Sequence, residues 1–254
     1  MISVELRDAL VALSHVDSVL VALDFDGTLA PLVDDPEKSR MLPAARGALI
    51  SLTHTPGVMV ALVSGRAIGS LLVVAEPLEE WFLVGSHGGE MVPPGRHHTY
   101  VAESIVPVEL DRAFLELVES HPGARLERKA FGLALHTRGL ELKLAREAEK
   151  AAKELCEEFS VELVIRSGHG ILECSLLHAS KADGVRALVE ITGAKATLFA
   201  GDDTTDEDAI RVLSDSDVGI WVGSGESAAP YRLADAGEVA QALELLVELS
   251  AHRH

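Results

Sequence analysis

Apolar runs alternate with amphipathic stretches at both ends of the chain. Short runs rich in Val, Leu and Ala predict strands that are buried on both faces, as in a parallel sheet. These strands are expected at residues 18–24, 58–64, 82–85, 196–200 and 218–222. Helices are expected between or beside them, at 4–14, 43–53, 67–75, 181–192, 206–213 and 238–249. Strands that alternate with helices in this way indicate an α/β fold with a Rossmann-like parallel sheet.

The pattern changes in the middle of the chain. Two helices, expected at 107–120 and 140–158, are each followed by a pair of strand-like runs. The four runs are 125–129, 133–138, 161–167 and 171–175. This order indicates a small α+β insert with an antiparallel sheet. The sequence therefore predicts a discontinuous core of residues 1–99 and 179–254, and an inserted cap domain of residues 100–178.

Composition narrows the class of partner. Hydrophobic residues make up 48% of the chain, enough for a substantial core, and aromatics only 4%. The formal net charge of −18 argues against a nucleic-acid partner, which needs clustered Lys and Arg. No apolar run is long enough to cross a bilayer, and no secretory signal is evident. Two cysteines are too few for a disulfide scaffold, and a reducing compartment is the simpler inference. A cytoplasmic monomer without a membrane partner is expected.

The first candidate site follows the first predicted strand. Asp24 and Asp26 stand in the segment Asp-Phe-Asp-Gly-Thr-Leu. Ligands of open parallel sheets bind beyond the carboxyl ends of the strands. Two carboxylates this close raise each other's pKa unless a cation lies between them, and Mg²⁺ prefers such oxygen ligands. A carboxylate can also serve as a covalent nucleophile. An Asp-x-Asp alone is also compatible with an ordinary turn; its place after a strand and the following Gly-Thr favour a site.

A second acidic segment follows the fourth predicted strand. Its sequence is Gly-Asp-Asp-Thr-Thr-Asp-Glu-Asp, residues 201–208, and contains Asp202, Asp203 and Asp206. Five acids so close together repel one another strongly without a cation, so a metal site is favoured over a helix cap. Asp206 alone remains compatible with a helix N-terminus.

Two weaker signals involve groups that can bind phosphate. Ser64, Gly65 and Arg66 follow the second predicted strand, where a hydroxyl and backbone N–H groups can hold phosphate oxygens. Lys181 is the first residue of a predicted helix, and its ammonium can pair with a carboxylate and a phosphate at the same time. Taken alone, the first segment is more often a simple turn, and a single lysine is more often a surface residue.

The four sites in this order resemble the haloacid dehalogenase-like phosphatase superfamily. The match is to Asp-x-Asp-Gly-Thr, Ser, Lys and Gly-Asp-Asp, and it covers the core. Four segments, 24–31, 64–66, 85–88 and 201–208, further resemble the trehalose-6-phosphate phosphatase family within it. The resemblance implies an enzyme that hydrolyses a sugar phosphate with Mg²⁺ through an aspartyl-phosphate.

The resemblance also implies roles for the core residues. Asp24 is the expected nucleophile, and Asp26 the acid that protonates the leaving oxygen and then activates water. Mg²⁺ is expected on Asp24, the backbone carbonyl of Asp26 and Asp202, with Asp203 and Asp206 holding metal-bound waters and the lysine. Ser64 and Lys181 are expected to neutralise the phosphoryl group. Further residues are expected to contact the substrate: Thr28, Gly65, Arg66 and His87.

Sugar recognition is expected in the insert. Glu127 and Lys129 alternate on one predicted strand, so they share a face, and His136 and Arg138 do the same on the next. Together with Glu173 they resemble the family's sugar-reading cap residues. A solvated sheet face with cross-strand ion pairs is the alternative.

Three other functions stay open from the sequence. The first is a related sugar-phosphate phosphatase, acting on sucrose 6-phosphate or mannosyl-phosphoglycerate, which only the cap residues would distinguish. The second is a phosphomutase. The third is an inactive binding module on the same fold, which would require a lost catalytic group, whereas all four core sites are intact.

Overall fold

The computed structural model describes residues 2–99, 106–129, 131–159, 163–168, 170–176 and 179–251. The chain forms two compact units, Met1–Tyr100 with Ala179–His254, and Val101–His178. Residues 100–105 and 177–178, at the two crossings between these units, lie outside the described residues. None of the described helices is both long and apolar enough to cross a membrane.

The first unit is built on a mostly parallel sheet. Within the described residues the sheet has seven strands in the order β11-β10-β9-β1-β2-β3-β4, and only β4 runs antiparallel to its neighbour. The strands are β1 (Val19–Leu23), β2 (Val58–Val63), β3 (Phe82–Gly85), β4 (Glu90–Val92), β9 (Ala196–Gly201), β10 (Val218–Val222) and β11 (Tyr231–Leu233). Every side chain of β1, β9 and β10 is buried, as their continuous apolar runs predict.

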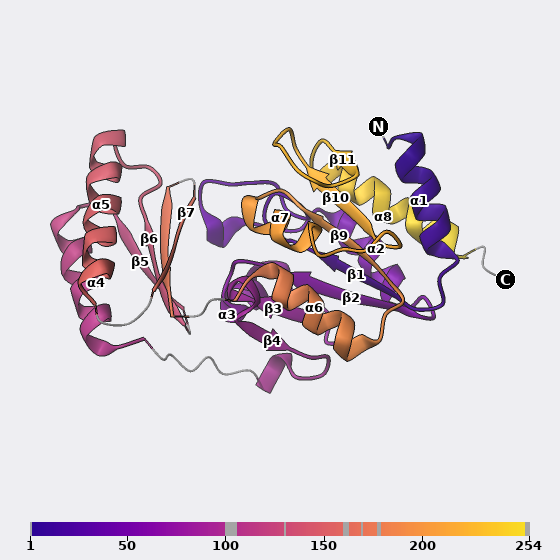
Figure 1. Cartoon of the computed structure of the whole chain (residues 1–254), viewed down its shortest axis with the longest axis horizontal. Helices are drawn as coiled ribbons and strands as arrows, with labels where there is room; N and C mark the ends of the chain where they lie inside the picture. The colour runs from indigo at the N-terminus through magenta and orange to yellow at the C-terminus, as the bar shows by residue number, and fades with distance from the viewer. Residues whose placement is uncertain are drawn as a thin grey trace. The chain divides into compact units, whose positions relative to one another are not determined.

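Helices cover both faces of this sheet (Figure 1). One hydrophobic cluster joins odd-numbered β1 residues such as Val21 to α1, α2, α3 and α8. The other joins Leu20 and Ala22 to α6 and α7. The helices are α1 (Val4–Ser14), α2 (Pro43–Thr53), α3 (Ile68–Ala75), α6 (Lys181–Thr192), α7 (Thr204–Ile210) and α8 (Ala236–Ala251). The predicted α/β class is thus confirmed, because a sheet with apolar side chains on both faces is buried by helices on each.

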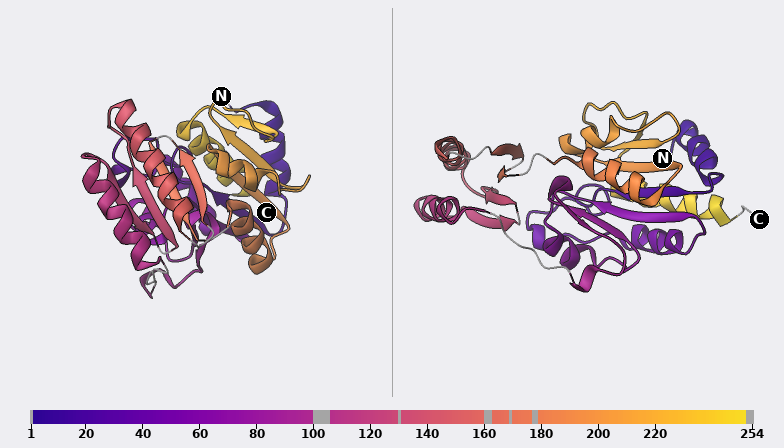
Figure 2. Two further views of the ribbon diagram at one scale, coloured as in Figure 1. Left: turned by 60° about the vertical axis from the view of Figure 1, so that its left-hand side comes forward. Right: turned by 60° about the horizontal axis from the view of Figure 1, so that its bottom comes forward.

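The second unit has a four-stranded antiparallel sheet in the order β5-β6-β8-β7. Its helices α4 (Val108–Ser120) and α5 (Leu142–Glu158) lie side by side on one face of the sheet (Figure 2). The strands are β5 (Arg125–Lys129), β6 (Gly132–His136), β7 (Val164–Gly168) and β8 (Ile171–Ser175). Alternate residues such as Leu133, Leu135 and Leu172 pack against the helices, which leaves the other sheet face polar.

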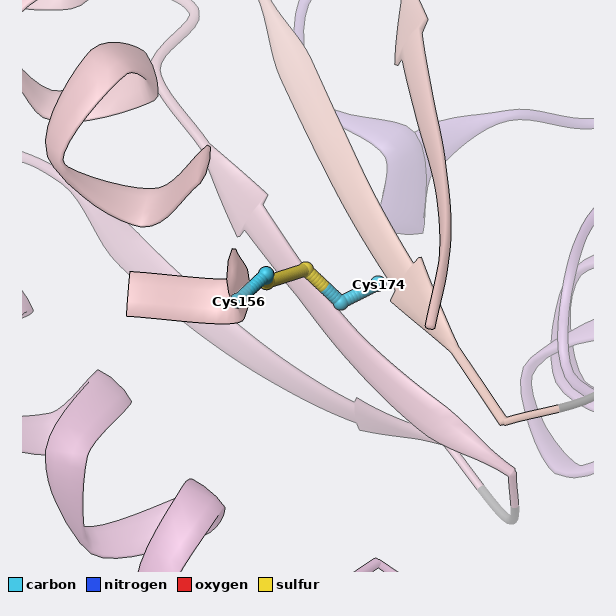
Figure 3. The surroundings of a disulfide bond; sticks show 2 residues. All are labelled: Cys156 and Cys174. Atoms are coloured by element: carbon cyan, nitrogen blue, oxygen red, sulfur yellow. A yellow bond between two sulfur atoms is a disulfide. The ribbon is translucent and has the colours of Figure 1, made fainter. Parts of the chain in front are cut away.

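The structure joins Cys156 of α5 to Cys174 of β8 by a disulfide (Figure 3). Both cysteines are buried in the second unit's core, where the apolar face of α5 packs on β8. A single disulfide does not make a disulfide scaffold. The reducing compartment inferred from the sequence implies free thiols, whereas the structure has the two cysteines bonded. The pairing could not be predicted from the sequence, because the two cysteines have a sequence separation of 18 and strand β7 lies between them.

Candidate active site

Three adjacent strands bring polar side chains to one edge of the core sheet. Asp24 follows β1, Asp202 follows β9 and Ser64 follows β2. β1 pairs in parallel with both of the other strands, and the Asp24 N–H donates to Ala200 O at 3.0 Å. The carboxyl ends of these strands therefore meet, as the general position of ligand sites in such sheets predicts.

Lys181 links two of the acids. Its Nζ lies 2.6 Å from Asp24 Oδ1 and 2.6 Å from Asp206 Oδ1, and all three side chains are at most 5% exposed. The lysine is the first residue of α6, which Ser180 and Asp183 fix with a capping box. Burial acts to lower the pKa of Lys181, but the charges of Asp206 and Asp24 outweigh it and raise that pKa. The ammonium is thus a permanent charge between two carboxylates.

Asp206 also shapes the second acidic segment. Its Oδ2 accepts the backbone N–H groups of Asp202 (3.2 Å) and Asp203 (3.0 Å). Asp203 is the exposed N-cap of α7, and its Oδ1 accepts the Thr204 N–H at 2.6 Å. Asp206 therefore helps to cap the start of α7 through its Oδ2, as the helix-cap interpretation states. Its Oδ1 separately contacts Lys181.

The buried acids form a group that could hold a metal ion. One carboxylate oxygen from each of Asp24, Asp202 and Asp206 lies within 4.8 Å of the others. Burial raises the pKa of Asp24 well above its usual range; Lys181 opposes this shift, and Asp206 and Asp202 add to it. Burial and then Asp206 raise the pKa of Asp202 to about 7. Three carboxylates share the single ammonium of Lys181, so a divalent cation suits the remaining negative charge.

Gly27 makes room for one of these carboxylates. Its φ is +82°, and a Cβ built there would lie 2.0 Å from Asp202 Oδ2. Any other residue at position 27 would therefore displace the Asp202 carboxylate and strain the backbone as well. The Gly of the Asp-x-Asp-Gly-Thr segment is thus required by the close approach of the two acidic segments.

Asp26 is held separately from the acidic cluster. Arg66 Nε donates to its Oδ2 at 2.5 Å, and Arg66 Nη2 donates to its Oδ1 at 2.7 Å. Ser39 Oγ donates to the same Oδ1 at 2.8 Å. Sequence reasoning missed Ser39, because it lies in an irregular segment without periodicity or motif. Arg66, which the resemblance assigns to the substrate, forms a two-point ion pair with Asp26 in the structure.

The turn after β3 lies against the Ser64 segment. Ser64 is buried and its Oγ accepts the Arg66 N–H at 3.1 Å, while the His87 N–H donates to Ser64 O at 3.1 Å. A Cβ on Gly65 would lie 2.5 Å from His87 Cε1, so the imidazole covers this glycine. The structure therefore brings Ser64, Gly65 and His87 together, whereas Thr28 is fully buried.

Four predicted sugar-contacting residues share the polar face of the second unit's antiparallel sheet, named the cap sheet after the predicted cap domain. Helices α4 and α5 cover the other face of this sheet. Register places Glu127 beside Ala134 and places Ala134 beside Glu173. His136 Nε2 lies 2.8 Å from Glu127 Oε2, and Lys129 Nζ pairs with Glu173 Oε1. Burial acts to raise the pKa of Glu127, but the hydrogen bond with His136 and the charge of Lys129 outweigh it, so that pKa is lowered. The residues are therefore close and paired in charge.

The predicted continuation of this face to Arg138 is wrong. Strand β6 ends at His136. The N–H groups of Thr137 and Arg138 both donate to Gly170 O, at 2.8 and 3.1 Å, and the chain then turns at Gly139. Arg138 is exposed in this turn and does not share a strand face with His136.

Solved structures identify the fold. The chain is similar to the C-terminal domain of the Candida albicans trehalose-6-phosphate phosphatase, with a TM-score of 0.79 and 23% identity over 95% of this chain and 96% of that one. It is also similar to a haloacid dehalogenase-like hydrolase from Bacteroides thetaiotaomicron, with a TM-score of 0.65 and 18% identity, covering 89% of this chain and 98% of the other. The chain therefore has the haloacid dehalogenase-like fold, with an acidic site at the carboxyl ends of its parallel strands.

Sequence comparison identifies the family. The trehalose-phosphatase family model matches residues 22–236, so the chain belongs to the trehalose-phosphatase family. It is 30% identical to the probable trehalose-phosphate phosphatase I of Arabidopsis thaliana, over 91% of this chain and 68% of that protein. It is 32% identical to the trehalose-phosphate phosphatase of Mycobacterium leprae over 85% of this chain, and the match spans 53% of the length of that relative.

Proposed function

We propose that this chain hydrolyses trehalose 6-phosphate to trehalose and inorganic phosphate. One observation carries the proposal: Asp24 is buried at a strand end, is held by Lys181, and lies beside Asp202 and Asp206. Relatives from the plant and bacterial branches carry names that specify trehalose phosphate, and the family model agrees with them. The core unit is the proposed catalytic domain and the inserted unit the proposed recognition domain.

Asp24 is the proposed nucleophile. Its carboxylate attacks phosphorus, the bond between phosphorus and the sugar oxygen breaks, and the electron pair passes to that oxygen. Lys181 supports this step because its fixed ammonium orients the Asp24 carboxylate and offsets the charge of the incoming phosphoryl group. Water then attacks the aspartyl-phosphate, which releases phosphate and restores Asp24.

Asp26 is the proposed proton carrier for both halves of the reaction. It gives a proton to the leaving sugar oxygen as the phosphorus–oxygen bond breaks. It then takes a proton from the attacking water, so the second half-reaction restores the acid. The two-point contact with Arg66 supports this role, because it holds the carboxylate in one orientation.

Mg²⁺ is the proposed cofactor. Asp24 and Asp202, with the backbone carbonyl of Asp26, would hold it. Burial and neighbouring acids raise the pKa of both carboxyl groups, and a bound cation would offset this by stabilising the ionised carboxylates. When bound, the ion neutralises negative charge on the carboxylates and the phosphoryl oxygens.

The polar face of the cap sheet is the proposed sugar-binding surface. Glu127, Lys129, His136 and Glu173 offer both hydrogen-bond donors and acceptors from three neighbouring strands. Sugar hydroxyls need both kinds of partner. The turn residue Arg138 is left out of this proposed set.

The test is phosphate release from trehalose 6-phosphate, sucrose 6-phosphate and mannosyl-phosphoglycerate, with Mg²⁺ and with a chelator. We expect trehalose 6-phosphate to give the highest kcat/KM and chelation to abolish its turnover. A clear preference for another sugar phosphate would refute the substrate assignment, and full turnover after exhaustive chelation would refute the metal. Transfer of phosphate to a second sugar, without release, would indicate a phosphomutase.

A further inference from the structure

The Asp26 carboxylate accepts three side-chain hydrogen bonds from two separate parts of the chain. Two come from the guanidinium of Arg66, and the third comes from Ser39, 13 residues after Asp26. Ser39 and Arg66 Nη2 donate to the same oxygen, Oδ1. The three hydrogen bonds together restrict the orientation of the carboxylate plane.

Ser39 is itself rigidly placed. It is fully buried and follows the short 3₁₀ helix η1 (Pro36–Lys38), whose first carbonyl accepts the Ser39 N–H at 3.3 Å. Arg66 Nη2 also donates to Pro36 O at 2.9 Å, so the arginine ties the same turn to Asp26. The Ser39 hydroxyl therefore lies on a short side chain attached to a buried backbone. The guanidinium of Arg66, in contrast, lies at the end of a long side chain.

The two contacts have different consequences. If Asp26 rotates, Arg66 can follow it, because three methylene groups connect the guanidinium to the backbone. Ser39 cannot follow, because its hydroxyl is one carbon from a buried backbone. Contact with Ser39 thus selects one carboxylate position among those that the Arg66 contact allows.

We propose that Ser39 is a positioning residue for proton transfer by Asp26. This inference rests on the proposed function, in which Asp26 protonates the leaving oxygen. Proton transfer requires the donor and acceptor at hydrogen-bond distance in the reacting complex, and small misplacements of a reacting group can cost about 100-fold in rate. Loss of the Ser39 hydroxyl leaves the Asp24, Lys181 and Asp206 contacts intact but removes this constraint on Asp26.

The experiment uses Ser39→Ala and substrates that differ in how much their leaving group needs a proton. p-Nitrophenyl phosphate releases a stable phenolate, whereas phenyl phosphate and trehalose 6-phosphate release more basic oxygens. We expect kcat/KM, which reports the steps up to release of the leaving group, to fall about 10- to 100-fold for the last two and by less than about threefold for p-nitrophenyl phosphate.

A matched control separates positioning from general damage. Ser14→Ala removes another buried hydroxyl of the same unit, one that donates to Val11 O at 2.8 Å in α1. It should leave all three rates near wild type. Equal losses in kcat/KM on the three substrates for Ser39→Ala, or no loss on any, would overturn the proposal.

A second variant covers the case in which Ser39→Ala does not fold. Arg66→Lys keeps a positive charge but removes the two-point contact with Asp26 and the contact with Pro36. It should show the same dependence on the leaving group, and an equal loss on all substrates would contradict the positioning role.

The ratio of phenyl to p-nitrophenyl phosphate rates tests Asp26 positioning even if trehalose 6-phosphate is not the substrate. A failed sugar assignment is thus distinguishable from a failed inference about Ser39.

Discussion

The two groups of charged residues differ in burial and in charge balance. In the core, Lys181 faces Asp24 and Asp206, side chains at most 5% exposed, with Asp202 beside them. On the cap sheet, Lys129 and Glu173 form one pair, and His136 and Glu127 form another that is up to 35% exposed. Acids outnumber bases in the core group, whereas the cap pairs acids and bases one to one. The core therefore suits a cation and a phosphoryl group, and the cap suits neutral hydroxyls.

The largest effect should come from the core nucleophile. Asp24→Asn keeps the size of the side chain but removes its charge and most of its nucleophilicity. We expect kcat to fall by more than about 10⁴-fold on both trehalose 6-phosphate and p-nitrophenyl phosphate. The exposed Asp8→Asn is the control and should keep wild-type rates. Substantial activity in Asp24→Asn would show that another group attacks phosphorus.

The second effect concerns stability of the core. Lys181→Met removes the ammonium between two buried carboxylates, so the free energy of unfolding should fall by about 3–5 kcal/mol in denaturant titrations without metal. Lys195→Met breaks an exposed pair with Asp17 and should cost less than about 1 kcal/mol. Similar losses in the two variants would mean that burial does not distinguish these ion pairs.

A smaller effect should be confined to the cap. Replacing both Cys156 and Cys174 by Ser opens a bond that closes a short loop, which should lower stability by about 3 kcal/mol. The lost structure belongs to the second unit, so hydrogen exchange should accelerate on α5 and β8 and remain unchanged on β1. Thiol titration of the unfolded, unreduced protein should find no free thiol; two free thiols would contradict the bond.

The sugar-binding proposal predicts a substrate-dependent effect. Glu127→Gln keeps the size of the side chain but weakens its acceptor strength and its pairing with His136. We expect kcat/KM for trehalose 6-phosphate to fall about tenfold, a loss of about 1.4 kcal/mol, with less than a twofold change for p-nitrophenyl phosphate. Glu116→Gln, on the exposed side of α4, is the control. Equal losses on both substrates would exclude a sugar-reading role.

The smallest effect is a pH dependence of cap stability. The folded state lowers the pKa of Glu127 from 4.5, so its stabilising contribution is present above that pH and is lost as pH falls through the folded pKa. The difference in unfolding free energy between wild type and Glu127→Gln should be below about 1 kcal/mol near neutrality and should shrink on acidification. A difference that grows as pH falls would reverse the sign of this linkage.

Continuous apolar runs made much of the core predictable. Buried strands that end at Asp24 and Ser64 place these residues at one sheet edge, and the expected helices at 4–14, 43–53 and 181–192 agree with α1, α2 and α6. The short edge strands β4 and β11 were not expected, because three residues carry too little periodicity to indicate a strand.

Side-chain contacts across irregular segments could not be predicted. Nothing in the sequence around Ser39 distinguishes it from other loop serines, since its role depends on the turn at Pro36 meeting Asp26. Arg138 follows the alternation of β6, but two backbone hydrogen bonds to Gly170 end the strand before it. Alternation predicts which face a strand residue takes, and it does not predict where the strand stops.

The chain order of the acidic site has a consequence for biosynthesis. Asp24 is synthesised early. Lys181 lies 157 residues later, so it leaves the ribosome only after the whole insert, and so does the Asp202 segment. A nascent chain that ends before position 181 carries the Asp24 carboxylate without its counter-ion and leaves β1 without its β9 neighbour. Closing such long-range pairings is slow, so catalytic competence should arise late, after the inserted unit has emerged.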